Sequence, residues 1–453
     1  MTRRSTRFLA LAVHLILLMG LLTACSSGTP TGKTTHNDSS SATFIKIAAD
    51  LPVNGADSSS SQAVENGVRM AIDEANASQL LPGYTFVFDL QNDADVSGHA
   101  NPAIGAENVT TLINDAEVAG IIGPFNSSVA QDELSITNAA PLVQIGPTST
   151  NICLTQNTID TGCIGPDNLL PKLRPTNKVT YFRVAAPNSD QGSVGADYAY
   201  QTLKYKTAFV IDDSTLDGLG LANAFATEYK IDGGTVLGQD SMAATISYAK
   251  ELTKIAHLRP ALVYFANGSE ISALAMRKQM VNTPGLEQTP LMGGDSLNTS
   301  AFVAAPGATS GGPVYSTVAV ADASKNPAAT SFTAQYKTSY GPLGAYSASS
   351  YDSTEILLNA IKAVIQAGTK MPANSNDADT AKVFRQAVID QIALTNYSGV
   401  TGEQSFDTTG DTTNKTIAIY QLATVSGSPA WKYVTKKTPI SWQGRATWHP
   451  GAG

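Results

Sequence analysis

Two hydroxyl-rich turns are the residues whose types and spacing most clearly indicate binding chemistry. The sequence GPFNSS at Gly123–Ser128 follows a short apolar run, and GPTST at Gly146–Thr150 follows the next one. Parallel α/β sheets bind ligands where strands end, because the helix N-termini there offer unpaired N–H groups. With such N–H groups, the hydroxyls of Ser127, Thr148 and Thr150 would bind a carboxylate without a buried arginine. The alternative is that these hydroxyls only cap helices.

An acidic residue occupies a comparable place further along the chain. Asp295 follows the apolar run Pro290–Met292. If Asp295 faces the hydroxyl turns, the two groups match the two ends of a zwitterion. The alternative is a helix N-cap, a common role for aspartate.

In the first hydroxyl-rich turn, Ser128 and Gln131 match a capping box. We therefore expect Ser128 to cap the following helix and Ser127 to face the ligand.

Catalytic constellations are not visible in the sequence. The histidines are well separated and have no metal-ligand spacing, and no Gly-x-Ser-x-Gly elbow occurs. The adjacent pair Asp212-Asp213 points in two directions and is typical of turn and cap residues. We therefore expect a protein that is not an enzyme and holds no metal. The histidines are His14, His36, His99, His257 and His449.

Two glycine motifs resemble nucleotide-binding loops only in part. Gly28–Thr34 has three residues between its glycines, where a phosphate loop needs four. Gly218–Asn223 has asparagine where a dinucleotide fingerprint needs a small residue. We therefore expect no cofactor.

The first 24 residues have the pattern of a lipoprotein signal peptide. Basic residues precede the apolar run Phe8–Leu22, which is too short to span a bilayer and is followed by Thr-Ala-Cys25. We expect cleavage before Cys25 and a lipid, palmitate included, on the new N-terminus. The alternatives are an incidental thiol or an uncleaved anchor. Residues 25–42 lack large apolar side chains and predict a flexible tether on the outer face of the cytoplasmic membrane.

Charge and cysteine content restrict the partners and the compartment. Loss of the leader changes the formal net charge from −8 to −11, so we expect no nucleic-acid partner, because that requires a basic face. Cys153 and Cys163 are the cysteines that remain after Cys25. In an oxidising compartment we expect them to form a disulfide, with two free thiols as the alternative.

Hydrophobic periodicity predicts an α/β protein of two domains. About four hundred residues exceed the usual limit of a single core, and short apolar runs alternate with helical patterns. Helices are expected at Val64–Ala75, Tyr248–Ile255, Ile356–Ile365 and Val383–Ile392. Strands are expected at Phe44–Leu51, Thr85–Leu90, Val118–Ile122, Leu142–Ile145, Thr207–Ile211, Thr235–Gln239, Ala261–Phe265 and Pro290–Met292, with a terminal hairpin of Thr416–Leu422 and Trp431–Val434.

An ordered set of short motifs resembles one protein family, the solute-binding lipoproteins of branched-chain amino-acid ABC transporters. Each motif is weak alone, but together they run from about Phe44 to Tyr433. They are Asp50–Gly55, Asn66–Asn76, Leu90–Asp93, Gly120–Pro124, Ile145–Asn151, Phe182–Val184, Asp190–Gly192, Pro290–Asp295, Gly402–Asp407 and Gly410–Asp411.

The resemblance implies the type I periplasmic-binding fold, with two Rossmann-like lobes of parallel-rich sheets and three hinge crossovers. It also implies a monomeric extracytoplasmic receptor that captures an amino acid or a similar small polar solute by cleft closure and delivers it to ABC permease subunits. A ligand-sensing lobe for a signalling partner is one alternative, and a receptor for an amide, urea or carboxylate solute without an α-amine is another. The expected domains are 1–24 signal peptide, 25–42 tether, 43–184 with 318–400 first lobe, 185–317 with 401–440 second lobe, and 441–453 tail.

By the same resemblance, Ser127, Thr148 and Thr150 hold the α-carboxylate of the ligand and Asp295 holds its α-ammonium. Departures from the family pattern concern the pocket walls. Asp217 stands where an aromatic residue is usual, and the turn containing Asn267 lacks another. The turn 56–60 replaces a loop that often carries an aromatic residue. We therefore expect small, polar walls and a polar or larger ligand. The remaining expected wall residues are Ser60 and Phe125.

Overall fold

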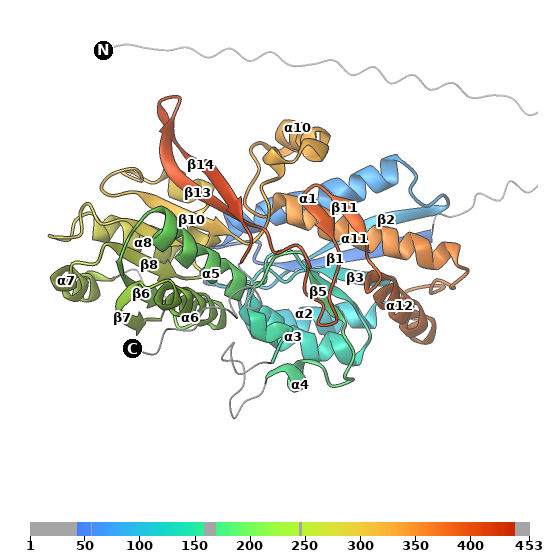
Figure 1. The fold of residues 1–453 in the computed structure, drawn as a ribbon. Helices are drawn as coiled ribbons and strands as arrows, with labels where there is room; N and C mark the ends of the chain where they lie inside the picture. The colour runs from blue at the N-terminus through green and yellow to red at the C-terminus, as the bar shows by residue number, and fades with distance from the viewer. Residues whose placement is uncertain (1–42, 56, 158–168, 244–246, 440–453) are drawn as a thin grey trace, which may run out of the picture. The chain divides into compact units, whose positions relative to one another are not determined.

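Two β-sheets organise the computed structural model, which describes residues 43–55, 57–157, 169–243 and 247–439 (Figure 1). In spatial order, the first sheet consists of the parallel strands β2 (Tyr84–Asn92), β1 (Thr43–Leu51), β3 (Val118–Ile122), β4 (Gln144–Gly146) and β5 (Tyr181–Arg183). The second consists of β14 (Ser428–Lys437), β13 (Ile417–Val425), β10 (Val314–Val318), β9 (Leu291–Gly293), β8 (Leu262–Ala266), β6 (Thr207–Asp212) and β7 (Thr235–Ser241). Its pairs β14–β13 and β13–β10 are antiparallel and the others are parallel. A small hairpin pairs β11 (Tyr397–Gly399) with β12 (Gly402–Gln404).

Helices cover both faces of each sheet, and we call each sheet with its helices a lobe. In the first lobe, one face packs on α1 (Ser58–Ala77), α11 (Ser347–Gln366) and α12 (Ala378–Ile392), and the other on α2 (Pro102–Asn114) and α3 (Ser127–Ala139). In the second lobe, one face packs on α5 (Asn188–Asp197) and α6 (Leu216–Ile231), and the other on α7 (Ala249–Leu258), α8 (Glu270–Met280) and α9 (Ser300–Ala304). The remaining helical segments are α4 (Leu169–Leu173), α10 (Thr330–Tyr340), η1 (Ile152–Leu154), η3 (Tyr198–Thr202), η4 (Asp295–Leu297), η5 (Ala323–Lys325) and η6 (Pro327–Ala329).

The strand sequences explain why both faces are covered. Successive side chains of a strand point to opposite faces, so a strand buried on both faces is apolar without alternation. In β6, Ala208 and Val210 join the core under α5 and α6, whereas Phe209 and Ile211 join the core under α7 and α8. This confirms the α/β fold with parallel-rich sheets expected from the sequence.

The chain passes between the lobes three times (Figure 1). It leaves the first sheet after β5, returns after β10 to the helices α10 to α12, and crosses again between β12 and β13. Three crossings allow the lobes to rotate as rigid bodies while the connecting segments absorb the change.

Most expected strands are present, with shifted ends. β3 has the predicted bounds, and the terminal hairpin exists, closed by the two-residue turn Ser426-Gly427. Both turn residues have positive φ, 51° and 85°, which fits the type I′ turn favoured by tight hairpins. The strand expected at Leu142–Ile145 lies at Gln144–Gly146 instead. The three-residue strand β5 was not expected.

Several expectations fall outside the described residues. These are the leader, Cys25, the tether, Cys163 and the tail 441–453, so the disulfide and the domain boundaries stay predictions. Among the helices that the structure describes, none is long and apolar enough to cross a membrane.

A buried ion pair fixes the first crossing. Arg183, the last residue of β5, and Asp411 are both fully buried, and Arg183 Nε donates to Asp411 Oδ1 over 2.7 Å. Arg183 also donates to the carbonyl oxygen of Asn151 (2.7 Å) and to the hydroxyl of Thr155 (2.6 Å). Burial alone raises the pKa of Asp411, but the charge of Arg183 outweighs it and holds this pKa below its ordinary value.

Replacing Asp411 with asparagine should lower the free energy of unfolding by about 3–5 kcal/mol, because the buried guanidinium of Arg183 loses its counter-charge. A depressed carboxyl pKa stabilises the fold above the unfolded value of 3.8, so the loss should be full at pH 7 and fade below about pH 4. Urea unfolding followed by circular dichroism measures both. The control is Asp390→Asn at an exposed position, and equal effects of the two substitutions would contradict the prediction.

Candidate functional site

The two hydroxyl-rich turns of the first lobe lie side by side at the carboxyl ends of β3 and β4. Gly123 permits this approach, because it has φ +137° and a Cβ there would lie 2.8 Å from the carbonyl oxygen of Asp50. The hydroxyl of Thr148 donates to the carbonyl oxygen of Phe125 over 2.7 Å. Ser149 donates to the carbonyl oxygen of Pro124 over 2.7 Å. These two hydroxyls therefore join one turn to the other.

Two further hydroxyls, those of Thr150 and Ser127, contact a carboxylate of the protein itself. Thr150 Oγ1 donates to Asp217 Oδ1 over 2.8 Å, and Ser127 Oγ lies 3.4 Å from the same oxygen. Asp217 is in the first turn of α6 in the second lobe, and Asn188 Nδ2 also lies 3.4 Å from its Oδ1. The lobes therefore touch in this structure, and a carboxyl group of one fills the hydroxyl pair of the other.

Glycines let α6 come this close. A Cβ at Gly220 would lie 2.5 Å from Asn188 Nδ2 and 2.9 Å from Asn151 Nδ2, and one at Gly218 would lie 2.2 Å from Asp213 Oδ1. The glycine turn that resembles half of a dinucleotide fingerprint thus serves close packing within the second lobe and, at Gly220, against Asn151 of the first.

The carboxyl group of Asp217 has a pKa well above its ordinary value. Burial raises the pKa of Asp217 to about 7, the negative charge of Asp295 adds to the rise, and the hydrogen bonds from Thr150 and Ser127 oppose it. A carboxyl group with this pKa exchanges a proton near neutral pH.

Asp295 opens the helical turn η4 directly after β9, as the sequence indicated. Gln191 of α5 holds it, since Gln191 Nε2 donates both to Asp295 Oδ1 (3.0 Å) and to the carbonyl oxygen of Thr317 (2.9 Å). Burial raises the pKa of Asp295. Its side chain does not cap η4, so the N-cap alternative does not describe it.

A cavity of about 30 Å³ lies beside Asp295, with walls from both lobes, and none of Ser127, Thr148, Thr150 and Asp217 lines it. Its volume suffices for roughly two water molecules. Of the expected site residues, Ser60, Phe125 and Asp295 line it, whereas Asn267 stands behind the wall and accepts a hydrogen bond from Ser296 (2.8 Å). The lining residues are Asp57, Ser60, Phe125, Gly268, Glu270, Asp295, Ser296, Thr299, Ala345 and Tyr346.

Sequence reasoning missed five polar residues of this cavity, namely Asp57, Glu270, Ser296, Thr299 and Tyr346. Asp57 and Glu270 belong to turns that were singled out only for lacking aromatic side chains. Tyr346 directly precedes α11, about two hundred residues beyond the hydroxyl turns, and no local pattern marks it. The expected cap at Ser128 is also wrong, because α3 begins at Ser127 with Asn126 as N-cap and no side-chain capping bond.

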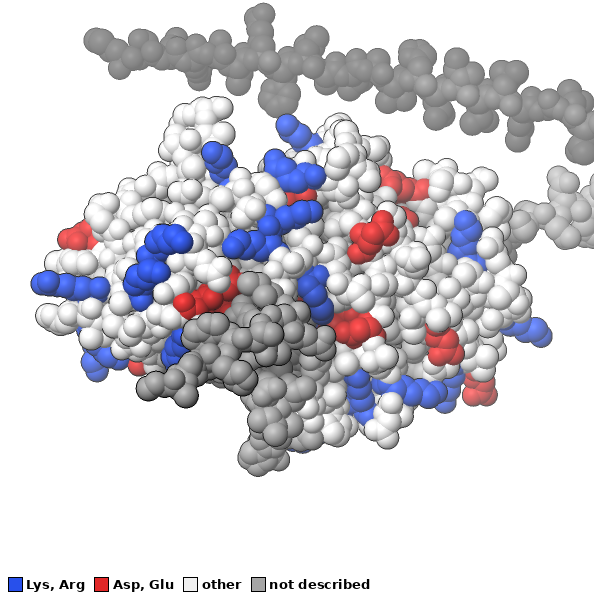
Figure 2. Space-filling model, in the orientation of Figure 1, with Lys and Arg blue, Asp and Glu red and all other residues white. Residues whose placement is uncertain are grey.

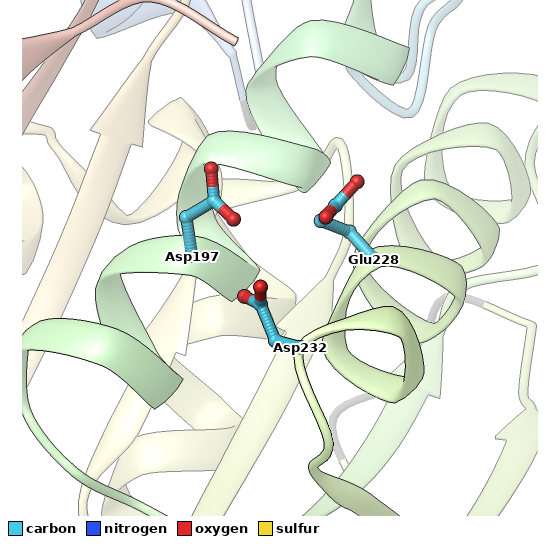
Figure 3. Close-up of side chains that lie close together, drawn as sticks. All are labelled: Asp197, Glu228 and Asp232. Atoms are coloured by element: carbon cyan, nitrogen blue, oxygen red, sulfur yellow. The ribbon is translucent and has the colours of Figure 1, made fainter. Parts of the chain in front are cut away.

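A group of three carboxylates elsewhere is the candidate metal-ligating cluster among the described residues. Asp197, Glu228 and Asp232 offer oxygens within 4.8 Å of one another where α5 and α6 end (Figure 3). Such groups are common in proteins without an ion, so this cluster alone indicates none. His99 and His257 are exposed, as expected, and His449 lies outside the described residues.

Comparisons with known proteins agree on one family. A family model described as periplasmic binding protein matches residues 45–428. The chain is 23% identical over 379 residues to Leu/Ile/Val-binding protein BraC3 of Rhizobium johnstonii, covering 83% of this chain and 91% of that protein. The fold is similar to leucine-binding protein LivK of Thermotoga maritima, with a TM-score of 0.68, 21% identity and coverage of 87% and 99%. It is also similar to a solute-binding protein of R. palustris in complex with 4-hydroxybenzoate, with a TM-score of 0.70, 17% identity and coverage of 88% and 99%.

Replacing Asp217 with asparagine should stabilise the protein at neutral pH. Because the pKa of Asp217 is raised from 3.8 to about 7 in the fold, the folded state holds a proton that the unfolded state has released, so stability is lost as pH rises through this range. The variant should therefore exceed the wild type by on the order of 1–3 kcal/mol at pH 8, with a smaller difference at pH 4.5.

Urea unfolding across this pH range measures the difference. Asp379→Asn is the matched control, because Asp379 is an exposed carboxylate in the first turn of α12. A difference between Asp217→Asn and wild type that does not vary with pH would contradict the prediction.

Proposed function

Because this chain belongs to the periplasmic binding protein family, we propose that it is the extracytoplasmic receptor of an ABC importer. It captures a small polar solute by closure of its lobes and presents it, as a monomer, to permease subunits in the membrane. The relatives support this role, since one is named for binding leucine, isoleucine and valine and another is solved with 4-hydroxybenzoate. The solute leaves the receptor chemically unchanged.

The observation that carries the proposal is the cavity between the lobes. Its walls combine Ser60 and Phe125 of the first lobe with Asp295 and Glu270 of the second, so rotation of the lobes opens and closes it. Around it the lobes meet through polar contacts, including Ser59 Oγ to Glu270 Oε2 (2.9 Å). A solute held by both walls stabilises the closed arrangement, which is how a receptor reports occupancy to its permease.

We propose specific roles for the residues identified from the sequence. Asp295 forms one polar end of the site, and the hydroxyls of Ser127 and Thr150 hold Asp217 beside it. Thr148 keeps the two turns together, because its hydroxyl is bound to a backbone oxygen. Asp217 and, through Ser296, Asn267 complete the second-lobe wall.

Solute that remains with the purified protein should be detectable. We expect native mass spectrometry of the gently purified receptor to show one bound small polar molecule, and disruption of the gene to reduce its uptake by cells. Returning the wild-type gene to the disrupted strain should restore uptake. Uptake that is unchanged in the disrupted strain would contradict the role in import.

We further propose that Cys25 carries a lipid and that the mature receptor stays on the outer face of the cytoplasmic membrane. Replacing Cys25 with serine removes the thiol that is acylated, so the protein should leave the membrane fraction. Fractionation and blotting measure this, with Asp379→Asn at an exposed position as control. Complete membrane retention of the Cys25 variant would rule out the anchor.

A further inference from the structure

The chemical class of the solute is indicated by what already fills the hydroxyl pair. Thr150 and Ser127 contact Asp217 Oδ1, so the place expected for a carboxylate of the solute holds one that belongs to the protein. Asn188 directs its amide to the same oxygen. A solute with its own carboxylate would have to displace Asp217 and would then face the negative charges of both Asp217 and Asp295.

Acidic side chains also dominate the cavity walls. Asp57, Glu270 and Asp295 line the cavity, and none of its lining residues is lysine or arginine. Their hydrogen-bond donors are neutral: Asn126 to Asp57 (3.4 Å), Ser59 to Glu270 (2.9 Å) and Gln191 to Asp295 (3.0 Å). Figure 2 shows lysine and arginine side chains on the outer surface, over the region of β13 and β14 among others.

The carboxyl groups act on one another because no residue that lines the cavity is lysine or arginine. Burial raises the pKa of Asp57 to about 6, and the charge of Glu270 adds to the rise, while Asn126 and the exposed His99 oppose it. Burial likewise raises the pKa of Glu270. Both carboxyl groups therefore bind a proton at a higher pH than free carboxyl groups, and a bound cation would oppose this shift.

Buried groups without partners give independent evidence of a missing donor. Tyr346 lines the cavity and is only 3% exposed, and its hydroxyl interacts with the carboxyl group of Asp295 without meeting the geometry of a normal hydrogen bond among the described residues. Asp295 and Asp217 lie near enough that their charges add to the effect of burial in raising the pKa of Tyr346. Beside Asp295, Gln191 Oε1 and the Tyr264 hydroxyl are buried and also lack a partner in the described chain. Native proteins rarely leave such groups unsatisfied.

We propose, as an extension of the proposed receptor function, that the solute is a small organic cation with an ammonium or guanidinium group and without a carboxylate. Its N–H groups bind Asp295, Asp57 and Glu270 and satisfy the Tyr346 hydroxyl. Asp217 occupies the hydroxyl pair and so excludes amino acids. Since the cavity of this structure has room for roughly two water molecules, its walls move apart to admit the solute, while Asp217 keeps its contact with Thr150 beside the cavity.

Calorimetric titration with matched amines and amino acids tests the proposal. Agmatine and isopentylamine are the decarboxylated forms of arginine and leucine, and 4-hydroxybenzoate serves as an anion without an amine. We expect each amine to bind at least roughly tenfold more tightly than its amino acid, and the affinity for the amine to rise from pH 5.5 to 8 as the carboxyl groups ionise. Tighter binding of the amino acids or of 4-hydroxybenzoate would overturn it.

Two variants separate the contributions of the acids. Asp295→Asn should weaken amine binding by roughly tenfold or more and flatten its pH dependence, whereas Asp217→Asn should improve binding of the amino acids. Asp379→Asn is the control, and thermal melting verifies that each variant is folded. Unchanged amine binding in Asp295→Asn would place the cation elsewhere and contradict the proposal.

The identity of the co-purifying molecule distinguishes the two levels of the proposal. A bound carboxylate solute would overturn the cation inference and leave the receptor function standing. Failure of every probe to bind, together with absence of any co-purified solute, would contradict both.

Discussion

The buried pair of Arg183 and Asp411 is the interaction on which the rest of the site depends. Arg183 ends the last strand of the first sheet, and Asp411 precedes β13 of the second, so the pair joins two of the three crossings. The same guanidinium holds the carbonyl oxygen of Asn151 and the hydroxyl of Thr155. One side chain thus positions the turn that carries Thr150 and the segment about which the lobes rotate.

The free energy of lobe closure depends on the burial of polar groups as well as on the burial of apolar surface. The contact surface brings Asp217, Asp295, Asp57 and Glu270 out of water, and a buried carboxylate without a counter-charge opposes closure. Thr150, Gln191 and similar neutral donors offset part of this penalty. A ligand shifts the equilibrium only by binding the closed state better than the open one. The buried carboxyl groups without a counter-charge in the closed state therefore determine which ligand stabilises it.

The fold was predictable from the sequence to a larger extent than the site. Strands such as Val118–Ile122 are long enough and apolar enough to be identified alone, whereas β5 has three residues and depends on its neighbour β4. The expected cap at Ser128 failed because the helix starts two residues earlier than that cap requires, at Ser127, whose hydroxyl contacts Asp217. That contact joins residues ninety positions apart on different lobes, so no local pattern encodes it.

The terminal hairpin affects whether neighbouring copies of the receptor pair through their sheet edges. β14 is the edge strand of the second sheet, and an unpaired edge is a template for pairing with the same strand of another molecule. Lys432 and Lys436 are exposed along β14, and Pro429 lacks the N–H group that a further strand would need. If lipid anchoring concentrates these receptors on a surface, like-charge repulsion and a missing donor along this edge disfavour their joining into a continuous sheet.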